Sequence, residues 1–276
     1  MATASTPKHA IMPLVTRSPL TSELVQAVYL GDLRDDGGFL IQGEVEGTAF
    51  SIAEDVFVTA GHVVRTITAS DRSAGIGLTS PSGNAQRVAL VRDSEELQGD
   101  VGLVKVEFLD PESRDWHGCL RWNAKQLQAL QPVVTFGYPY GIHHADTGAT
   151  IVSRAFSGHV VSTLESFKPL GSSLAPFRAH EISFGAPRGL SGSPLFTTED
   201  ELLVGGVVIG NSKSQMLILQ AEEVEETNGT KTKVEQYESL SLGVATAVSA
   251  ILPIESRLLG NTIRGWLESR GAVTGG

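Results

Sequence analysis

The stretch GLSGSPLF, residues 189–196, places two serines beside two glycines immediately before an apolar run. Glycine supplies the positive φ angles that tight turns need, so the stretch is consistent with an ordinary turn ahead of a strand. Small residues also let a backbone approach a ligand closely. The same stretch is therefore consistent with an exposed nucleophilic serine whose neighbouring amides bind an anion.

The composition favours an all-β protein. The chain has 276 residues, with 30 glycines, 12 prolines and only 19% charged residues. A chain of this length can bury one large core or two small barrels, and Gly and Pro supply the dihedral angles of many short turns. We therefore expect short strands rather than a helical bundle.

Charge and cysteine content limit the expected partners and compartment. With 31 acidic and 21 basic residues, the formal net charge is -10. This offers no basic surface for nucleic acid or an anionic membrane, so neither partner is expected. Cys119 is the only cysteine and stands between two tryptophans, which is more typical of a small buried hydrophobe than of a nucleophile. The first twenty residues contain no apolar run of signal-peptide length, so we expect a cytoplasmic protein.

The apolar pattern predicts two β units. Short apolar runs between turn residues predict a first unit over 37–107 and a second over 131–252. Residues 108–130 lack strand alternation and form the connector between them. Within the second unit, the charged stretch 221–238 contains the turn dipeptide Asn228-Gly229 and predicts a solvated hairpin tip. An acidic cation site is the alternative interpretation of that stretch.

The flanking segments predict two helices. In the extension 1–36, Ser18 before Pro19 indicates the start of a short helix, whose near-helical apolar positions are Leu20, Leu24, Ala27 and Val28. In the segment 253–276, an apolar stripe predicts a C-terminal helix within 254–270, its stripe being Leu259, Ile263, Trp266 and Leu267.

Three stretches supply the side chains that covalent hydrolysis of a peptide bond requires, namely a hydroxyl, a base and a group that orients the base. His62 follows the strand-like run FVTAG, where a turn can present its ring to a cleft. Asp100 stands directly before the apolar run VGLVKV, and Ser191 lies in GLSGSPLF. Since His62 and Asp100 fall in the first β unit and Ser191 in the second, we expect the site between the two units.

These motifs together resemble those of the trypsin/chymotrypsin-like serine peptidases, in their bacterial form. They occur in the family's order, and they read Thr59-Ala60-Gly61-His62-Val63, Gly99-Asp100-Val101-Gly102-Leu103 and Gly189-Leu190-Ser191-Gly192-Ser193-Pro194. The stretch FGYPYG, residues 136–141, is similar to the turn that opens the second barrel in bacterial members. The resemblance covers roughly residues 37–252.

The resemblance implies a fold and a set of roles. The fold would be all-β, with two six-stranded antiparallel barrels. The short N-terminal helix and the C-terminal helix expected from the sequence pattern would flank these barrels, outside the region of resemblance. His62 would be the general base and then the general acid, Asp100 would orient it, and Ser191 would form an acyl-enzyme. The amides of Gly189 and Ser191 would form the oxyanion hole, and Ser193 would replace a family glycine rather than act as a second nucleophile.

One position departs from the family. Animal digestive members have an aspartate at the position of Leu190, and it pairs with a new N-terminal amine after zymogen cleavage. Leucine cannot form that ion pair. Activation by such cleavage is therefore not expected, and the oxyanion loop must be ordered either constitutively or by binding a substrate or partner.

The specificity pocket is expected from residues 182–188 and 205–212, neither of which contains an acidic residue. We therefore expect a small or apolar residue ahead of the scissile bond, with the substrate added as a strand beside 205–210. The expected substrate contacts are Gly185, Ala186, Pro187, Val208, Ile209 and Gly210. No metal or organic cofactor is expected. Weaker candidates are His143-His144 for a metal and His180-Glu181 for the pocket, with a solvated loop and an outward-facing strand as their alternatives.

The sequence thus predicts a serine endopeptidase of restricted specificity that acts on protein or peptide substrates and is open to control by a regulatory protein. The alternative is a catalytically silent trypsin-like fold that binds peptides in the same cleft. The two differ in whether Ser191 is activated.

Overall fold

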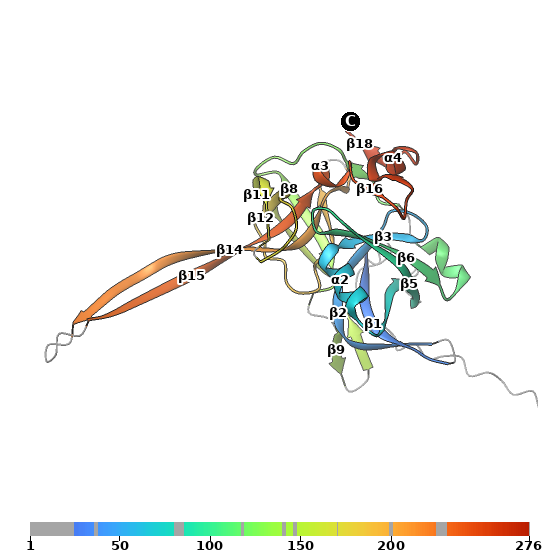
Figure 1. Cartoon of the computed structure of the whole chain (residues 1–276), viewed down its shortest axis with the longest axis horizontal. Helices are drawn as coiled ribbons and strands as arrows, with labels where there is room; N and C mark the ends of the chain where they lie inside the picture. The colour runs from blue at the N-terminus through green and yellow to red at the C-terminus, as the bar shows by residue number, and fades with distance from the viewer. Residues whose placement is uncertain are drawn as a thin grey trace, which may run out of the picture.

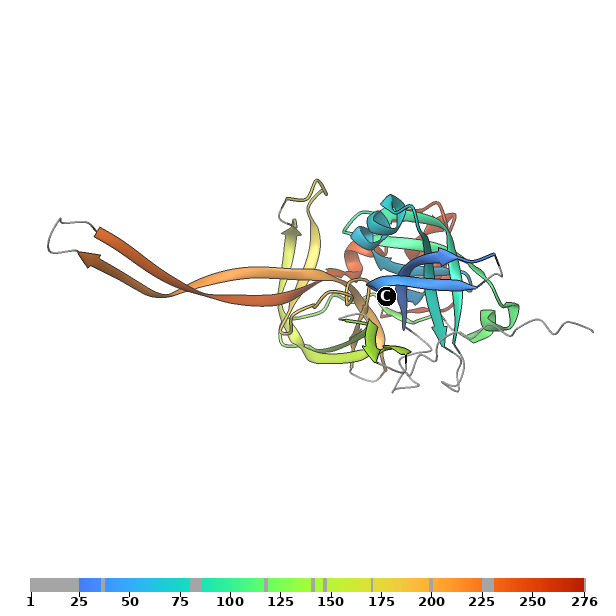
Figure 2. The ribbon, with the colours of Figure 1, turned by 90° about the horizontal axis from the view of Figure 1, so that it is seen from below.

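The computed structural model describes residues 25–35, 38–79, 86–116, 119–139, 142–145, 148–169, 171–198, 201–224 and 231–275. Two β-rich bodies lie next to each other, and a long two-stranded arm projects away from them (Figures 1 and 2). No helix in these described ranges is long and apolar enough to cross a membrane.

The first body is a closed barrel of six antiparallel strands in the order β1-β2-β3-β6-β5-β4. Pairing of the first strand with both the second and the fourth closes the barrel. The strands are β1 (Val25–Leu33), β2 (Phe39–Ser51), β3 (Val56–Ala60), β4 (Ser73–Thr79), β5 (Gln86–Leu97) and β6 (Val101–Phe108).

Strand β1 corrects the expected N-terminal helix. Residues 25–33 form a barrel strand, so the first barrel begins at Val25 and not at residue 37. Both faces of this strand are buried, with Val25 and Tyr29 in one apolar cluster and Val28 and Leu30 in another. A strand buried on both faces lacks polar alternation, and its apolar positions therefore also fit helical spacing. Ser18 and Pro19 lie outside the described residues.

In the second body six antiparallel strands close into a barrel, which confirms the expected fold class. Its strands follow the order β13-β8-β11-β12-β15-β14, and pairing of β13 with β14 closes the ring. They are β8 (Pro132–Gly137), β11 (Arg154–Phe167), β12 (Phe177–Ile182), β13 (Pro194–Thr197), β14 (Leu203–Val224) and β15 (Lys231–Ala247). Two short strands, β7 (Trp122–Asn123) and β18 (Val273–Thr274), extend the same sheet in parallel from β14.

Short elements connect and cover the barrels. They are α2 (Gly61–Ala69), the 3-10 helix η1 (Pro111–Trp116), β7 (Trp122–Asn123), β9 (Ile142–Ala145), β10 (Gly148–Ile151), α3 (Val248–Ile251), β16 (Glu255–Ser256), β17 (Asn261–Thr262), α4 (Ile263–Glu268) and β18 (Val273–Thr274). The expected C-terminal helix exists as α4 but is shorter than the predicted stripe. It begins only at Ile263 because Thr262 caps it by accepting the Gly265 N–H at 3.0 Å.

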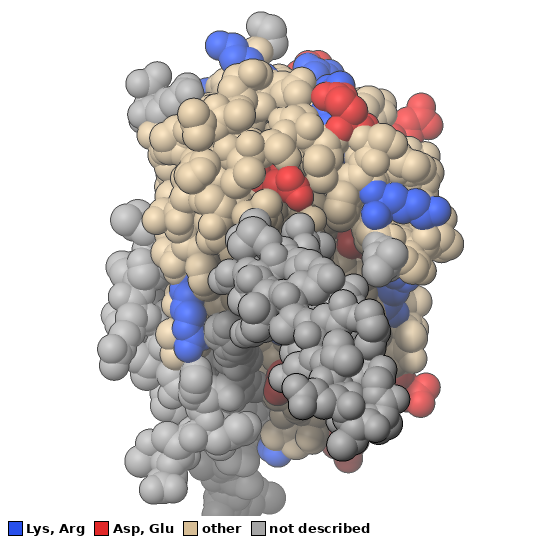
Figure 3. Space-filling model, turned by 90° about the vertical axis from the view of Figure 1, so that its left-hand side faces the viewer, with Lys and Arg blue, Asp and Glu red and all other residues tan. Residues whose placement is uncertain are grey.

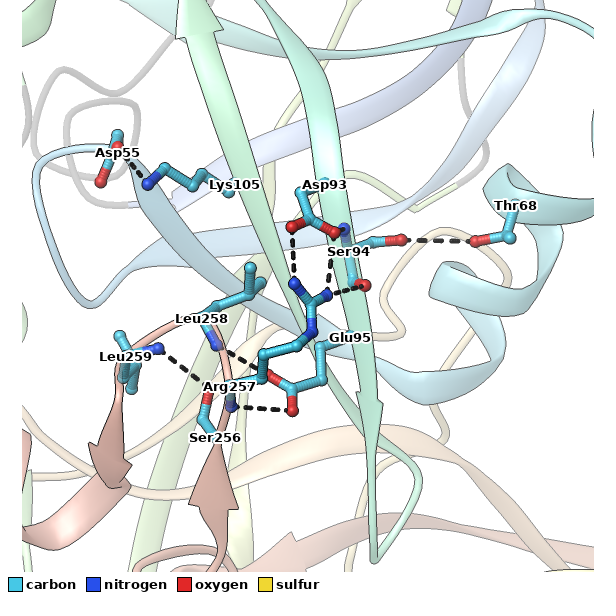
Figure 4. Close-up of polar contacts among 10 residues, drawn as sticks. All are labelled: Asp55, Thr68, Asp93, Ser94, Glu95, Lys105, Ser256, Arg257, Leu258 and Leu259. Atoms are coloured by element: carbon cyan, nitrogen blue, oxygen red, sulfur yellow. Dashed lines mark hydrogen bonds and ion pairs between the residues drawn. The ribbon is translucent and has the colours of Figure 1, made fainter.

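The C-terminal segment is fastened to the first barrel through a polar cluster (Figure 4). Glu95 of β5 accepts hydrogen bonds from Ser256 Oγ at 2.8 Å, from the Arg257 N–H at 2.9 Å and from the Leu258 N–H at 3.2 Å. The Arg257 guanidinium binds both oxygens of Asp93, at 2.7 and 2.9 Å. Strand β5 leads into the turn that carries Asp100, so this cluster stabilises the strand that precedes the turn.

The arm is the outer part of the β14–β15 hairpin, residues 212–224 and 231–242. Its strands pair only with each other, from Ser212↔Leu242 to Val224↔Lys231. The charged hairpin predicted over 221–238 is therefore the end of this arm, and its dipeptide Asn228-Gly229 lies outside the described residues. Figure 3 views the molecule from the arm side; on the described part of that face, charged side chains of both signs lie scattered among uncharged ones.

Candidate active site

Helix α2 places His62 in its first turn, directly after strand β3. The sequence pattern predicts a turn here, and the structure has a helix instead because a distant residue caps it. The first amides of a helix have no partner inside it. The Asp100 carbonyl accepts from the Gly61 N–H at 2.7 Å, and Asp100 Oδ1 accepts from the His62 N–H at 2.9 Å. The carboxylate thus lies at the positive end of the helix dipole.

The same carboxylate orients the imidazole ring. Asp100 Oδ2 lies 2.8 Å from His62 Nδ1. Since an ionised carboxylate only accepts hydrogen bonds, this contact places a proton on Nδ1 and leaves a free lone pair on Nε2. The His62 side chain is 36% exposed and that of Asp100 is 6% exposed. The ring can therefore exchange a proton with a ligand while its partner stays shielded from water.

Both barrels hold the turn that carries Asp100. Gly99 and Asp100 both have left-handed φ angles, 78° and 54°, a region that Asp tolerates better than most side chains. Thr246 of β15, in the second barrel, donates its hydroxyl to the Gly99 carbonyl. On the first barrel, Arg65 Nη2 donates to Asp100 Oδ1 at 3.0 Å, and the same guanidinium pairs with Glu96.

The loop that carries Ser191 consists of two consecutive type II turns. One spans 187–190 and the other 190–193, and a hydrogen bond of 3.0 Å closes each. The third residue of each turn is a glycine with positive φ, 91° at Gly189 and 90° at Gly192, as this turn type requires. Ser191 is the second residue of the second turn. Both glycines of GLSGSPLF are thus explained by the turns that present this serine.

Two amides of this loop are available to an external acceptor. The N–H groups of Gly189 and Ser191 donate to no other residue in the described part of the chain. Those of Leu190, Gly192 and Ser193 all donate to backbone carbonyls. The free pair is the pair expected to form an oxyanion hole.

Ser191 is half-buried and lies against the segment that carries His62. Its carbonyl accepts from the Thr48 N–H of β2 at 2.8 Å. A methyl group added to Gly47 would contact both the Ser191 carbonyl, at 3.0 Å, and the Val63 side chain. Among the described residues, Ser191 Oγ makes no hydrogen bond with the His62 ring. Such bonds are often long until a substrate tightens the site.

A cavity of about 260 Å³ opens beside His62, between the barrels. His62, Arg65 and Asp100 line it from the first barrel. The lining from the second barrel is largely apolar and consists of Phe167, Pro169, Ser172, Leu174, Ile209, Gly210, Asn211 and Val244. The cavity thus places an apolar surface next to the imidazole.

The residues expected to contact the substrate have different roles in the structure. Ile209 and Gly210 line the cavity. Val208 is instead an internal anchor, because its N–H donates to Ser193 O at 2.9 Å and its carbonyl accepts from the Gly192 N–H at 2.7 Å. The strand edge expected over 205–210 is wrong for its first part, since Gly206 and Val207 of β14 are paired with β13 on one side and with β15 on the other. The open edge starts at Ile209.

Asn211 lies in the segment 205–212 expected to build the pocket, but its part as a bridge across the pocket is not predicted from the sequence. Its Oδ1 accepts from the Ala186 N–H at 2.6 Å, and its Nδ2 donates to Ala186 O at 2.7 Å. The side chain thus bridges the segment of Gly185, Ala186 and Pro187 to the end of β14. A contact between residues 25 positions apart leaves no local sequence pattern.

The remaining candidates take no part in this arrangement. Ser193 is fully buried, and its hydroxyl has no partner in the described structure. Burial raises the pKa of the Cys119 thiol, which disfavours a thiolate. His180 is buried and contacts Thr163 Oγ1 at 3.1 Å, so it faces neither solvent nor the cavity. The side chain of His143 lies outside the described residues.

A family model described as the trypsin-like peptidase domain matches residues 47–205, which is more than half of the chain. The chain belongs to the trypsin-like peptidase family. The matched region contains His62, Asp100 and Ser191, and both barrels contribute to it.

The solved structure of one other protein agrees with the trypsin-like fold. Neuropsin, a serine protease of mouse brain, aligns with a TM-score of 0.50 at 10% identity, covering 85% of this chain and 95% of neuropsin. An HtrA-type protease, AlgW with a decapeptide, aligns with a TM-score of 0.48 at 14% identity over 82% of this chain and 61% of AlgW. The comparison with curated protein sequences found no match.

Proposed function

We propose that this trypsin-like protein is a serine endopeptidase in which Ser191 is the nucleophile, His62 the base and Asp100 the orienting carboxylate. The observation that carries the proposal is the Asp100–His62 contact of 2.8 Å, which fixes the ring with Nε2 free. A buried carboxylate that caps the helix of its histidine and also orients the ring has a geometry suited to general base catalysis.

In the proposed reaction, Ser191 Oγ attacks the carbonyl carbon of the scissile bond while His62 Nε2 takes the hydroxyl proton. The carbonyl oxygen becomes an oxyanion, which accepts hydrogen bonds from the N–H groups of Gly189 and Ser191. His62 then gives its proton to the leaving amine, and the C–N bond breaks. Water, deprotonated by His62, attacks the resulting ester and releases the acid and Ser191.

The substrate class proposed is a protein or peptide with a small or apolar residue ahead of the scissile bond. Asn211 supports this, because its side chain occupies the space between Ala186 and the end of β14, the two expected walls of the pocket. The apolar lining at Phe167, Leu174 and Ile209 supports an apolar side chain further upstream in the substrate.

A peptide-library digestion tests the proposal. The wild type is expected to cleave internal bonds, and Ser191→Ala is expected to retain only a residual activity, lower by about 10³-fold or more. Ser193→Ala is the matched control, since its serine lies two positions away but is buried. If the wild type cleaves no peptide but binds library members with the affinity of Ser191→Ala, the protein is a peptide-binding module and the proposal is wrong.

A further inference from the structure

Thr48 connects the first barrel to the loop of Ser191. It lies on β2 and is fully buried. Its hydroxyl donates to Gly189 O at 2.7 Å and accepts from the Tyr138 N–H at 3.1 Å. Its own N–H donates to Ser191 O at 2.8 Å. Thr48 of the first barrel therefore binds both Gly189 and Ser191, the two residues of the second barrel whose N–H groups donate to no other described residue.

The direction of the Thr48 hydroxyl proton is fixed by its partners. An amide N–H can only donate, so Thr48 Oγ1 accepts from Tyr138 and must direct its single proton to Gly189 O. The Thr48 carbonyl is held in turn by Thr59 Oγ1 at 2.7 Å. The side chain thus has no alternative arrangement without leaving a buried polar atom unpaired.

These bonds fix two peptide planes next to the free amides: the plane between the Gly189 and Ser191 amides, and the plane that follows the Ser191 amide. The Gly189–Leu190 plane is held at its carbonyl by Thr48 Oγ1 and at its N–H by Pro187 O, at 2.7 and 3.0 Å. The next fixed plane, from Ser191 to Gly192, is held by the Thr48 N–H and by Val208 O, at 2.8 and 2.7 Å.

The turn type determines where the Gly189 N–H points. Types I and II differ mainly by a rotation of the central peptide, which here carries this N–H, and by the sign of φ at the third residue. Gly189 has φ 91°, the type II value. The bond from Thr48 to the Gly189 carbonyl anchors the peptide plane that directly follows this residue, so the Gly189 N–H lies one Cα away from a fixed plane. Loss of the bond would release that plane and let the Gly189 N–H shift.

We propose that the Thr48 hydroxyl is the positioning group that keeps the oxyanion hole formed. This inference rests on the proposed peptidase function. It identifies a group within this chain that orders the oxyanion hole, so that no second protein chain is needed for that task. Leu190 is fully buried and carries no charge, so no ion pair at that position can hold the loop. Thr48 supplies the order through neutral hydrogen bonds inside the chain.

The test compares Thr48→Val, which keeps the shape but removes the hydroxyl, with Thr48→Ser, which keeps the hydroxyl. The readout is the second-order rate of Ser191 labelling by a fluorophosphonate, whose phosphoryl oxygen occupies the oxyanion position. Thr48→Val is expected to label about 10- to 100-fold more slowly, while Thr48→Ser stays within about threefold of the wild type. With the best library peptide, kcat should fall by a similar factor and KM should change little.

The outcomes separate the two claims. Equal labelling of Thr48→Val and wild type overturns the role of Thr48 while leaving the peptidase proposal intact. A loss in Thr48→Ser as large as in Thr48→Val also overturns it, because packing would then be the cause. A wild type that is never labelled refutes the proposed function and this inference with it. Circular dichroism checks folding, and Thr48→Ala replaces the valine variant if that variant does not fold.

Discussion

At the scale of single residues, Asp100 both stabilises a helix and orients a side chain of the candidate site. Its carbonyl and Oδ1 cap helix α2, and its Oδ2 orients the imidazole of His62. The residue type follows from all of these, since the position needs a left-handed backbone, a helix-capping oxygen and a permanent acceptor. The spacing of the motifs indicated the pairing of His62 with Asp100, but the capping role had no sequence signal because the helix itself was not predicted.

The substitution Asp100→Asn separates these tasks. Asn also tolerates left-handed φ and keeps one oxygen as an acceptor, so the fold should be retained. Its NH₂ group can donate to Nδ1, which favours the wrong tautomer of His62. We expect kcat to fall by about 10⁴-fold, the size of the effect known for this change in a related triad, with circular dichroism unchanged. Steady-state kinetics on a library-derived peptide measure it, and a loss below tenfold would contradict the orienting role.

At the scale of elements, the turns around Ser191 could be anticipated and their supports could not. Glycine at positions 189 and 192 is a local signal for positive φ. Thr48 binds Gly189, which lies 141 positions away, and neither Thr48 nor Asn211 leaves a periodic or local pattern. Strand β1 shows a different limit, because burial on both faces removes the alternation by which strands are recognised. Residues 25–33 form a strand because they pair with β2 and β4 in the barrel, and this pairing outweighs the helical spacing of their apolar residues.

The turn at Gly192 gives a prediction with an internal control. A side chain at Gly192 would have unfavourable φ and would also overlap Thr48 O, whereas Gly43 has a similar φ of 86° with open space around it. We expect Gly192→Ala to abolish peptidase activity and to lower the free energy of unfolding by more than about 3 kcal/mol. Gly43→Ala should cost only about 1 kcal/mol and keep activity. Similar losses in urea unfolding and activity for both variants would contradict the role assigned to the Gly192 contact.

Strand β12 carries a buried histidine that gives the fold an acid sensitivity. Burial, with a smaller effect of Arg178, lowers the pKa of His180 to about 4. The unfolded chain binds a proton below about pH 6.5 while the folded chain does not until about pH 4, so stability falls as pH drops through this window. This group accounts for up to about 3 kcal/mol of that loss.

Urea unfolding at pH 7.0 and pH 4.5 tests the effect of His180. The wild type should lose about 2 kcal/mol more than His180→Gln between these two values, because glutamine can still bind Thr163 but does not titrate. Other titrating groups contribute equally to both proteins and cancel. Parallel losses in the two proteins would exclude a neutral His180.

At the scale of the whole molecule, each barrel stabilises a site-bearing turn of the other barrel. Thr48 of the first barrel binds the loop of Ser191, and Thr246 of the second binds the turn of Asp100. The geometry therefore depends on how the barrels are docked, and the cluster at Glu95 fastens the C-terminal segment to strand β5 of the first barrel (Figure 4). Sequence motifs located both halves of this site, whereas the docking contacts emerged only from the packed structure.

The Glu95 cluster is expected to stabilise the fold. Burial of Glu95 opposes its ionisation, but hydrogen bonds from the Arg257 N–H, Ser256 and the Leu258 N–H outweigh it and lower the pKa of Glu95. The contribution of the carboxylate is therefore present above about pH 4.3 and is lost as pH falls further. At pH 7, Glu95→Gln should lower the free energy of unfolding by roughly 1–2 kcal/mol, because the amide nitrogen cannot accept these bonds.

Glu107→Gln is the matched control for that change. Glu107 lies on the neighbouring strand β6 and forms an exposed ion pair with Arg92. Such pairs contribute little, so urea unfolding should detect a change within about 0.5 kcal/mol. If both variants are equally stable, the C-terminal cluster does not hold the barrel.

The measurement that tests the central claim most directly is the intact mass of the purified protein after treatment with a fluorophosphonate. An activated Ser191 predicts one adduct on the wild type and on Ser193→Ala, located by peptide mapping to Ser191, and none on Ser191→Ala or His62→Ala. A folded wild type that acquires no adduct, or an adduct that persists in Ser191→Ala, would contradict the assignment of Ser191 as a nucleophile activated by His62.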